Sequence, residues 1–186
     1  MKSIVKNIID KYKILFPNDD INEFEEFVLS SSDTEIYDWN NFNGHIVASA
    51  FVYAKRENKF LVLYHRDLGR YLYPGGHVDS TDLNPLEAAK RETIEETGIS
   101  EFEIFNFTND ELIPLEIDTH YIKRNERLNL PMHHHFDFRY LFIVNQICDV
   151  VIDLDESRDY KWVSIDELDT CVKSGNIVNR IRDLEL

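Results

Sequence analysis

The sequence predicts an α/β protein that begins with a helical appendage. Residues 2–30 place apolar side chains at helical spacing, whereas the runs that start at His45 alternate as strands do. A helix with clear start and stop signals, Pro85–Thr97, follows these strand-like runs. The chain has 186 residues, of which 43% are hydrophobic, so it can bury one substantial core. We expect the appendage at residues 1–43 and the main domain at residues 44–186.

The appendage is expected to contain two amphipathic helices. The first covers residues 2–16 and ends before Pro17. The second covers roughly residues 20–30, with three polar residues before it as possible caps: Asn18, Asp19 and Asp20. Because this polar, helical segment precedes a strand-rich part, we interpret it as a candidate homodimer contact or lid.

The main domain is expected to alternate strands with single helices. Residues 45–55 and 59–66 are rich in β-branched and aromatic side chains, and the turn between them predicts a hairpin. Ser164, with Glu167 three positions later, predicts a capped helix. A last helix is expected near residues 176–184. The other predicted strands are 71–73, 77–78, 102–107, 112–121, 135–145 and 160–163.

The central helix combines good boundaries with an acidic face. Asn84 is a suitable N-cap, Pro85 suits the first helical position, and Gly98 suits the residue after the end. Residues three and four apart share a face of a helix, which brings together Glu92, Glu95 and Glu96. A solvated acidic surface is the alternative interpretation of such a face.

Three crowded carboxylates repel one another unless a cation neutralises them. Hard oxygen ligands of this kind suit Mg²⁺, with Mn²⁺ as an alternative. Upstream, Gly75 and Gly76 allow backbone to approach the acidic face closely. A glycine turn beside a carboxylate-rich helix therefore predicts a place for a metal and a diphosphate.

These residues resemble the Nudix hydrolase signature, G-x5-E-x7-R-E-U-x-E-E-x-G-U, where U is aliphatic. Gly76 fits the opening glycine, and the closing half fits Arg91-Glu92, Glu95-Glu96, Gly98 and Ile99. The flanking runs HRDLGRYLYPGGHVD and HHHFDFRYLF look like those of a small prokaryotic branch of this family. The resemblance covers roughly residues 44–170. Asp82 stands where the first glutamate falls, one extra residue separates it from Arg91, and Thr93 replaces an aliphatic residue.

The resemblance implies a Nudix-type α/β/α sandwich around a mixed sheet. It also implies metal-dependent hydrolysis of the pyrophosphate linkage in a nucleoside diphosphate joined to another group. By this resemblance Glu95 and Glu96 are the principal metal ligands, Glu92 shares metal or water contact, and the Gly76 carbonyl adds a ligand. Arg91 is expected to orient Glu95, its i,i+4 neighbour. The general base is left open among Glu156, Glu116 and Asp118.

A second polar feature is the run His133–Tyr140. Alternation along a strand places four polar residues on one face: His133, His135, Asp137 and Arg139. This face predicts a cleft wall, where Arg139 binds phosphate and His133 or His135 donates to it. A hydrogen-bonded network that buttresses the sheet is an equal alternative. A transition-metal site is a third, less favoured reading, because imidazoles two apart on a strand can chelate.

Basic and aromatic residues next to Gly75 suggest further substrate contacts, which we assign to Arg66, Arg70, Tyr73 and His77. The alternative for the tyrosines is ordinary half-buried packing in short strands.

Composition limits the partners. The formal net charge of −15 argues against nucleic acid polymers and anionic membranes, and the N-terminus lacks the apolar run of a leader or membrane span. We therefore expect a cytoplasmic protein with a small nucleotide substrate. Cys148 and Cys171 are expected to be reduced. Two other functions stay open: a non-catalytic nucleotide sensor, and an isoprenoid-diphosphate isomerase, which is disfavoured because its relatives use a cysteine on an early strand.

Overall fold

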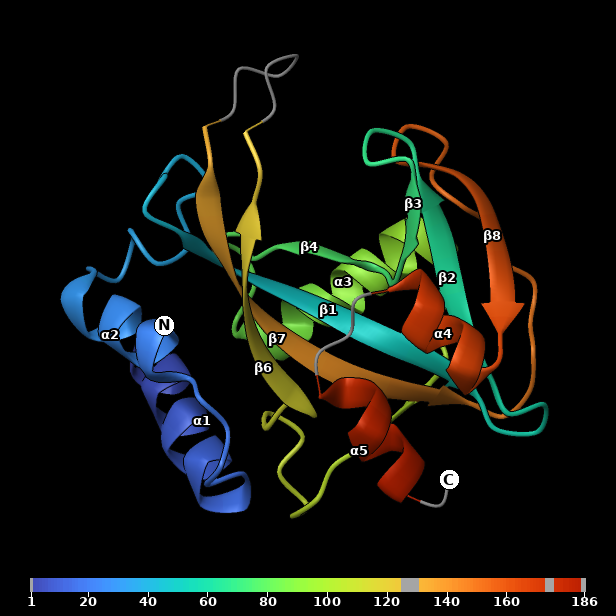
Figure 1. Cartoon of the computed structure of the whole chain (residues 1–186), viewed down its shortest axis with the longest axis horizontal. Coiled ribbons are helices and arrows are strands. Elements are labelled where there is room, and N and C mark those ends of the chain that lie inside the picture. The colour runs from blue at the N-terminus through green and yellow to red at the C-terminus, as the bar shows by residue number, and fades with distance from the viewer. Residues whose placement is uncertain (1, 125–130, 173–175, 185–186) are drawn as a thin grey trace.

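The protein is an eight-stranded mixed sheet with helices against both faces (Figure 1). The computed structural model describes residues 2–124, 131–172 and 176–184. The helices are α1 (Lys2–Leu15), α2 (Asn22–Ser30), α3 (Pro85–Thr97), α4 (Ile165–Cys171) and α5 (Ile177–Asp183). The strands are β1 (His45–Ala54), β2 (Lys59–His65), β3 (Arg70–Leu72), β4 (Gly75–His77), β5 (Glu103–Ile104), β6 (Glu116–Ile122), β7 (His133–Val144) and β8 (Ser157–Val163).

Strands β1 and β7 form the parallel centre of the sheet. Their register runs from His45 opposite His135 to Ala54 opposite Val144. The other pairs are antiparallel: β1 with β2 and β4, β7 with β5 and β6, and β2 with β3 and β8. Because partners in a ladder share a face, the polar side chains of β1 and β7 lie on the same side of the sheet.

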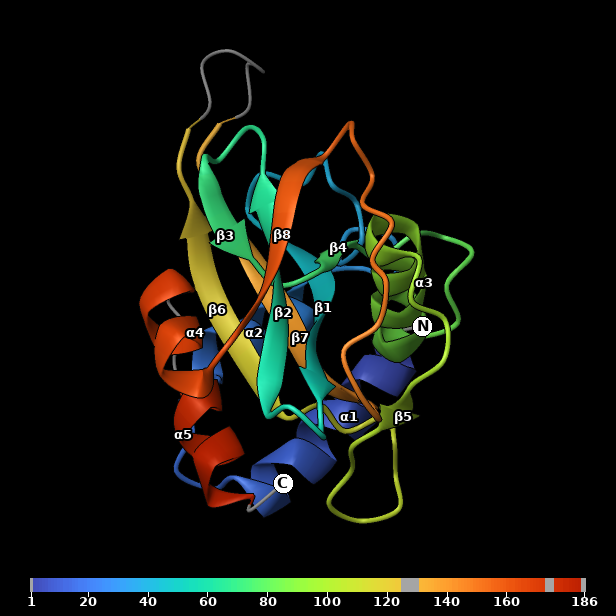
Figure 2. The same ribbon diagram turned by 90° about the vertical axis from the view of Figure 1, so that its right-hand side faces the viewer.

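The two faces of the sheet carry separate hydrophobic clusters. Ile46 and Phe138 face α1, α2 and α3, whereas Phe51 and Leu141 face α4 and α5. Figure 2 shows α3 on one side of the sheet and α4 and α5 on the other. The predicted α/β/α sandwich around a mixed sheet is therefore confirmed.

The N-terminal helices pack directly on the sheet. Phe24 of α2 stacks on Phe136 with ring centroids 5.0 Å apart, and it meets the edge of Phe138 at 5.2 Å. The buried hydroxyl of Tyr12 in α1 accepts hydrogen bonds from Ile117 N and from Arg180 Nη1, at 3.1 and 2.7 Å. Residues 2–43 thus share the core of the rest of the described chain, and a domain boundary after residue 43 stays a prediction.

Several local expectations need correction. The strand expected at 102–107 is reduced to Glu103–Ile104. The strand expected at 112–121 begins at Glu116, because Pro114 has no N–H to give to a ladder. The N-cap of α2 is Ile21, without a side-chain cap, and Asp19 instead pairs with Arg180 of α5. In the described residues, no helix combines the length and the apolar character that crossing a bilayer requires.

Candidate active site

Helix α3 is held at both ends by the residues that its sequence supplies. The Asn84 side chain accepts a hydrogen bond from Glu87 N at 3.1 Å, and Gly98 adopts a left-handed φ of +71° after the last turn. Leu86 and Ala89 are buried in the cluster that α3 shares with the sheet. The extra residue before the helix therefore leaves the helix itself regular.

The glycine pair lies against the acidic face of α3. Gly75 N donates to Glu96 Oε1 at 2.8 Å. A β-carbon at Gly76 would lie 2.6 Å from Glu92 Oε1, and one at Gly75 would lie 2.4 Å from the β-carbon of Ser49. An alanine at Gly75 would collide with Ser49 and would also be strained by the φ of +154°. An alanine at Gly76 would instead require the Glu92 carboxylate to move away, so glycine there allows this carboxylate to lie close to the backbone.

Arg91 is the cation of this cluster. Its Nη1 donates to Glu92 Oε1 and Glu95 Oε2, at 2.9 Å each, so the expected i,i+4 contact is present. Its Nη2 donates to the His77 carbonyl at 2.8 Å and to Asp82 Oδ2 at 3.0 Å. Asp82 is buried, and its carboxylate therefore ties the loop between β4 and α3 to the helix through Arg91.

Burial raises the pKa of two of the glutamates and so favours their neutral form. Removal from water raises the pKa of Glu92 to about 7 and that of Glu96 to about 8, and the nearby charge of Glu156 adds to both shifts. The side chain of Glu95 is 55% exposed. Two buried carboxylates with raised pKa values thus lie beside a single arginine. Their oxygen atoms are the kind of ligand that a hard divalent cation prefers, so this set of side chains fits such a cation.

Glu156 and Glu116, two of the three candidates for the general base, lie in different parts of the structure. Arg66 N donates to the Glu156 carbonyl at 2.8 Å, and Asp153 N donates to the Glu96 carbonyl at 3.3 Å, so this turn adjoins the end of α3. The Arg66 guanidinium donates to the Leu154 carbonyl at 2.5 Å. Glu116, in contrast, is the first residue of β6, where it is buried opposite Arg139 of β7. It accepts from Arg139 Nη1 at 2.8 Å and from Asn176 N at 2.7 Å.

Arg139 is the centre of a buried ion network. Its side chain is only 3% exposed and pairs with Glu116, Asp118 and Asp137, at 2.8, 2.6 and 3.0 Å. Asp137 also accepts from Ser49 Oγ at 2.8 Å. These contacts correspond to the network alternative. A substrate contact by Arg139 or Asp137 would require this network to open.

Tyr73, the aromatic residue expected to bind substrate, adjoins this network. Its hydroxyl donates to Asp137 Oδ2 at 3.4 Å, and its ring packs on Phe51 at a centroid distance of 4.3 Å. Arg70 is exposed on β3, opposite His65. Tyr73 is therefore partly engaged in packing, whereas the side chain of Arg70 is open to solvent.

A cluster of histidines occupies the same face near the start of β1 and β7. His133 Nε2 lies 3.2 Å from His135 Nε2, and the His45 ring lies 5.0 and 4.8 Å from these two rings. His77 is 4.9 Å from His45. Burial lowers the pKa of His45 to about 4 and that of His135 further. The sequence predicts His45 only as the start of a strand, because it is the parallel pairing of β1 with β7 that brings it to this cluster.

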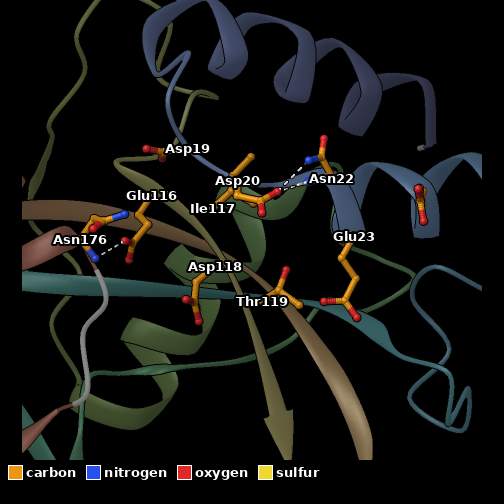
Figure 3. A pocket seen from close by; sticks show the side chains of 10 residues that line it. Asp19, Asp20, Asn22, Glu23, Glu116, Ile117, Asp118, Thr119 and Asn176 are labelled. Carbon is orange, nitrogen blue, oxygen red and sulfur yellow. Dashed lines mark hydrogen bonds between the residues drawn. The ribbon is translucent and has the colours of Figure 1, made fainter.

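An acidic cavity lies apart from α3. It measures about 470 Å³ and lies between α2, β6 and the start of α5, with Asp20, Glu23, Glu116 and Asp118 in its wall (Figure 3). None of its lining residues comes from α3 or from the glycine pair. Because like charges repel, this wall does not suit a diphosphate. We therefore place the candidate active site at α3 and not in this cavity.

Comparison with known sequences identifies one family. Residues 44–181 match the profile of the NUDIX domain. A probable DHNTP pyrophosphohydrolase of Lactococcus lactis subsp. cremoris (strain MG1363) is 33% identical over 114 residues, which are 61% of this chain. The matched part spans 63% of the length of that relative.

Solved structures show the same fold. An Ap4A hydrolase of C. elegans, in a binary complex, has a TM-score of 0.58 and 20% identity, and the match covers 74% of this chain and 95% of that one. The dihydroneopterin triphosphate pyrophosphohydrolase of E. coli has a TM-score of 0.58 and 17% identity, over 75% and 93% of the two chains. At these identities the likeness concerns the fold alone.

Proposed function

Since this chain belongs to the Nudix hydrolase family, we propose that it is a divalent-metal-dependent pyrophosphohydrolase. Its substrate is a nucleoside diphosphate linked to another group. One observation carries the proposal: Gly75 N donates to the Glu96 carboxylate, and Gly76 lies so close to the Glu92 carboxylate that a β-carbon there would be 2.6 Å from Glu92 Oε1. If the fold were retained only for stability, nothing would require the backbone of the glycine pair to lie this close to two buried carboxylates.

We assign Glu95 and Glu96 as the principal metal ligands, with Glu92 and the Gly76 carbonyl completing the set. These residues would hold Mg²⁺ or Mn²⁺, which would supply positive charge to neutralise the phosphates and would lower the pKa of a bound water. Arg91 keeps Glu92 and Glu95 in place by donating to both. The Gly75 N–H fixes one oxygen of Glu96, which leaves the other oxygen for the metal.

Glu156 is our choice for the general base. Its charge contributes to the raised pKa of both Glu92 and Glu96, so it lies near the proposed metal ligands, whereas Glu116 is bonded to Arg139. A base must reach the attacking water. Arg70, Tyr73 and His77 flank Gly75 and are assigned to substrate binding. We expect Glu156→Gln to lower turnover much more than Glu116→Gln does.

The decisive experiment is a substrate screen with Mg²⁺ or Mn²⁺ and chromatographic identification of the products. The panel contains nucleoside triphosphates, nucleotide sugars, dinucleoside polyphosphates and dinucleotides. Dihydroneopterin triphosphate is added because of the name of the Lactococcus relative. Glu95→Gln and Glu96→Gln should each abolish turnover in a folded protein. Glu87→Gln is the matched control, because Glu87 lies on the same helix and pairs with Lys90.

Full activity of both variants would overturn the assignment. Tight nucleotide binding without phosphate release, in Mg²⁺ and Mn²⁺ alike, would instead favour the non-catalytic sensor. For the isomerase alternative, Cys148 and Cys171 are free thiols, both half-buried. A Cys148→Ser, Cys171→Ser double variant with unchanged pyrophosphate cleavage is the expected result.

A homodimer through the N-terminal helices is a separate proposal. It rests on two exposed apolar side chains, Ile14 of α1 and Leu29 of α2, which expose 79% and 58% of their surface. Light scattering at micromolar concentration tests it directly, and a monomer under these conditions would count against it.

A further inference from the structure

We propose that His45, His133 and His135 bind a zinc ion, at a site separate from the carboxylates of α3. This site lies on the other side of the turn at Gly75 and Gly76 from the carboxylates of α3. The proposal does not depend on the reaction that the protein catalyses. It names a ligand class, a divalent transition metal held by neutral imidazole nitrogens. Among the residues that the structure describes, these three histidines each offer one ring nitrogen as a ligand atom, and the three nitrogens lie within 4.8 Å of one another.

The geometry of two members already matches zinc. Zn–N bonds are about 2.0–2.1 Å long, so two nitrogens of a tetrahedral site lie about 3.3 Å apart. The Nε2 atoms of His133 and His135 are 3.2 Å apart. The third ligand atom lies within 4.8 Å of the others, a separation that small rotations of the rings reduce.

His45 provides the independent sign of a ligand. It is 1% exposed, and neither of its buried ring nitrogens makes a hydrogen bond of ordinary geometry. The Asn41 backbone lies near the ring and slightly favours its protonated form, but burial outweighs this contact and lowers the pKa. An unsatisfied buried polar group costs about 1–3 kcal/mol. A hydrogen bond between His133 and His135 explains their short distance, but it leaves His45 unsatisfied. A shared metal ion explains both observations.

The surroundings orient the rings as they do around known metals. His133 Nδ1 lies 2.9 Å from the Pro131 carbonyl and must donate to it, which leaves the Nε2 lone pair free toward the cluster. His120 adjoins His135 with ring centroids 5.6 Å apart, and its Nδ1 lies 2.8 Å from an Asp118 carboxylate oxygen. A ring held by a carboxylate in this way has its other nitrogen available for a fourth ligand position.

Ligand chemistry separates this site from the one on α3. Mg²⁺ prefers oxygen ligands in octahedral geometry, whereas imidazole suits zinc. The three proposed ligands include no carboxylate. Zinc should therefore bind here in the presence of a large excess of Mg²⁺, which occupies the carboxylates.

The test is a zinc titration of chelator-treated full-length protein in excess Mg²⁺, read by competition with a chromogenic chelator. We expect one equivalent of zinc for the unaltered protein. His133→Gln and His135→Gln should each weaken binding by more than about 100-fold, because even outer-shell changes cost about 10–100-fold. His134→Gln is the matched control, since His134 lies on the same strand but faces Glu23. Its zinc affinity should be unchanged.

Two further measurements keep the result interpretable. His45→Leu removes the unsatisfied ring and should fold at least as stably without metal, yet lose the rise in melting temperature that zinc produces in the unaltered protein. Co²⁺ should give the visible absorption of tetrahedral coordination in the unaltered protein only. Equal zinc affinity of the unaltered protein and His135→Gln would overturn the proposal, as would loss of zinc binding in Glu96→Gln.

Discussion

Replacing Glu96 by glutamine should stabilise the metal-free protein while it destroys the proposed metal site. Glu96 is 8% exposed and its pKa is raised from 4.5 to about 8, chiefly by burial. As the pH rises, the unfolded chain releases this proton first, so unfolding becomes easier between about pH 4.5 and about pH 8. Glutamine mimics the protonated carboxyl, can still accept from Gly75 N, and has no such pH dependence.

The expected gain follows from these two pKa values. At about 1.4 kcal/mol per pH unit, it is below about 1 kcal/mol at pH 5 and about 3 kcal/mol at pH 7, as an order of magnitude. Urea unfolding in EDTA at the two pH values measures it. Glu95→Gln is the control, because its exposed carboxylate has little desolvation to relieve. A gain for Glu96→Gln that is equal at both pH values, or a loss at pH 7, would refute the reasoning.

Three other substitutions probe different parts of the molecule. Gly76→Ala should lower turnover more than tenfold in a folded protein, since its β-carbon would lie 2.6 Å from Glu92 Oε1; unchanged kinetics would contradict the close approach. Arg139→Met leaves buried carboxylates unpaired and should cost about 3–5 kcal/mol in urea unfolding. Phe24→Ala should lower the free energy of unfolding by about 3–5 kcal/mol within one cooperative transition, whereas its control, Ile14→Ala, should leave that free energy almost unchanged. A separate early unfolding transition would indicate that the N-terminal helices are not part of the core.

Local signals explain why α3 was predictable to the residue. Asn84, Pro85 and Gly98 act within one turn of the helix ends, and helical spacing alone brings Glu92 near Glu96. Alternation along β7 likewise identified the polar face of His133–Arg139, because that pattern needs only the strand itself.

Long-range pairing explains what the sequence did not reveal. His45 joins the histidines only because β1 runs parallel to β7, ninety positions away in register, and nothing near Gly44 signals this. Glu116 was a candidate for the general base, but the pairing of β6 with β7 places it opposite Arg139, with which it forms an ion pair. The N-terminal helices look like an appendage by their polarity, yet Phe24 finds its partners on β7.

Ser49 connects the turn at Gly75 and Gly76 to the buried ion network around Arg139. Its β-carbon forms the wall against which Gly75 fits, and its hydroxyl donates to Asp137, which is paired with Arg139. A change that moves the ion network can therefore displace Gly75 and, through its N–H, the oxygen of Glu96. The precision of the proposed metal ligands would then depend on charges buried on the other face of the sheet, so we expect mutations there to alter catalysis without touching metal or substrate.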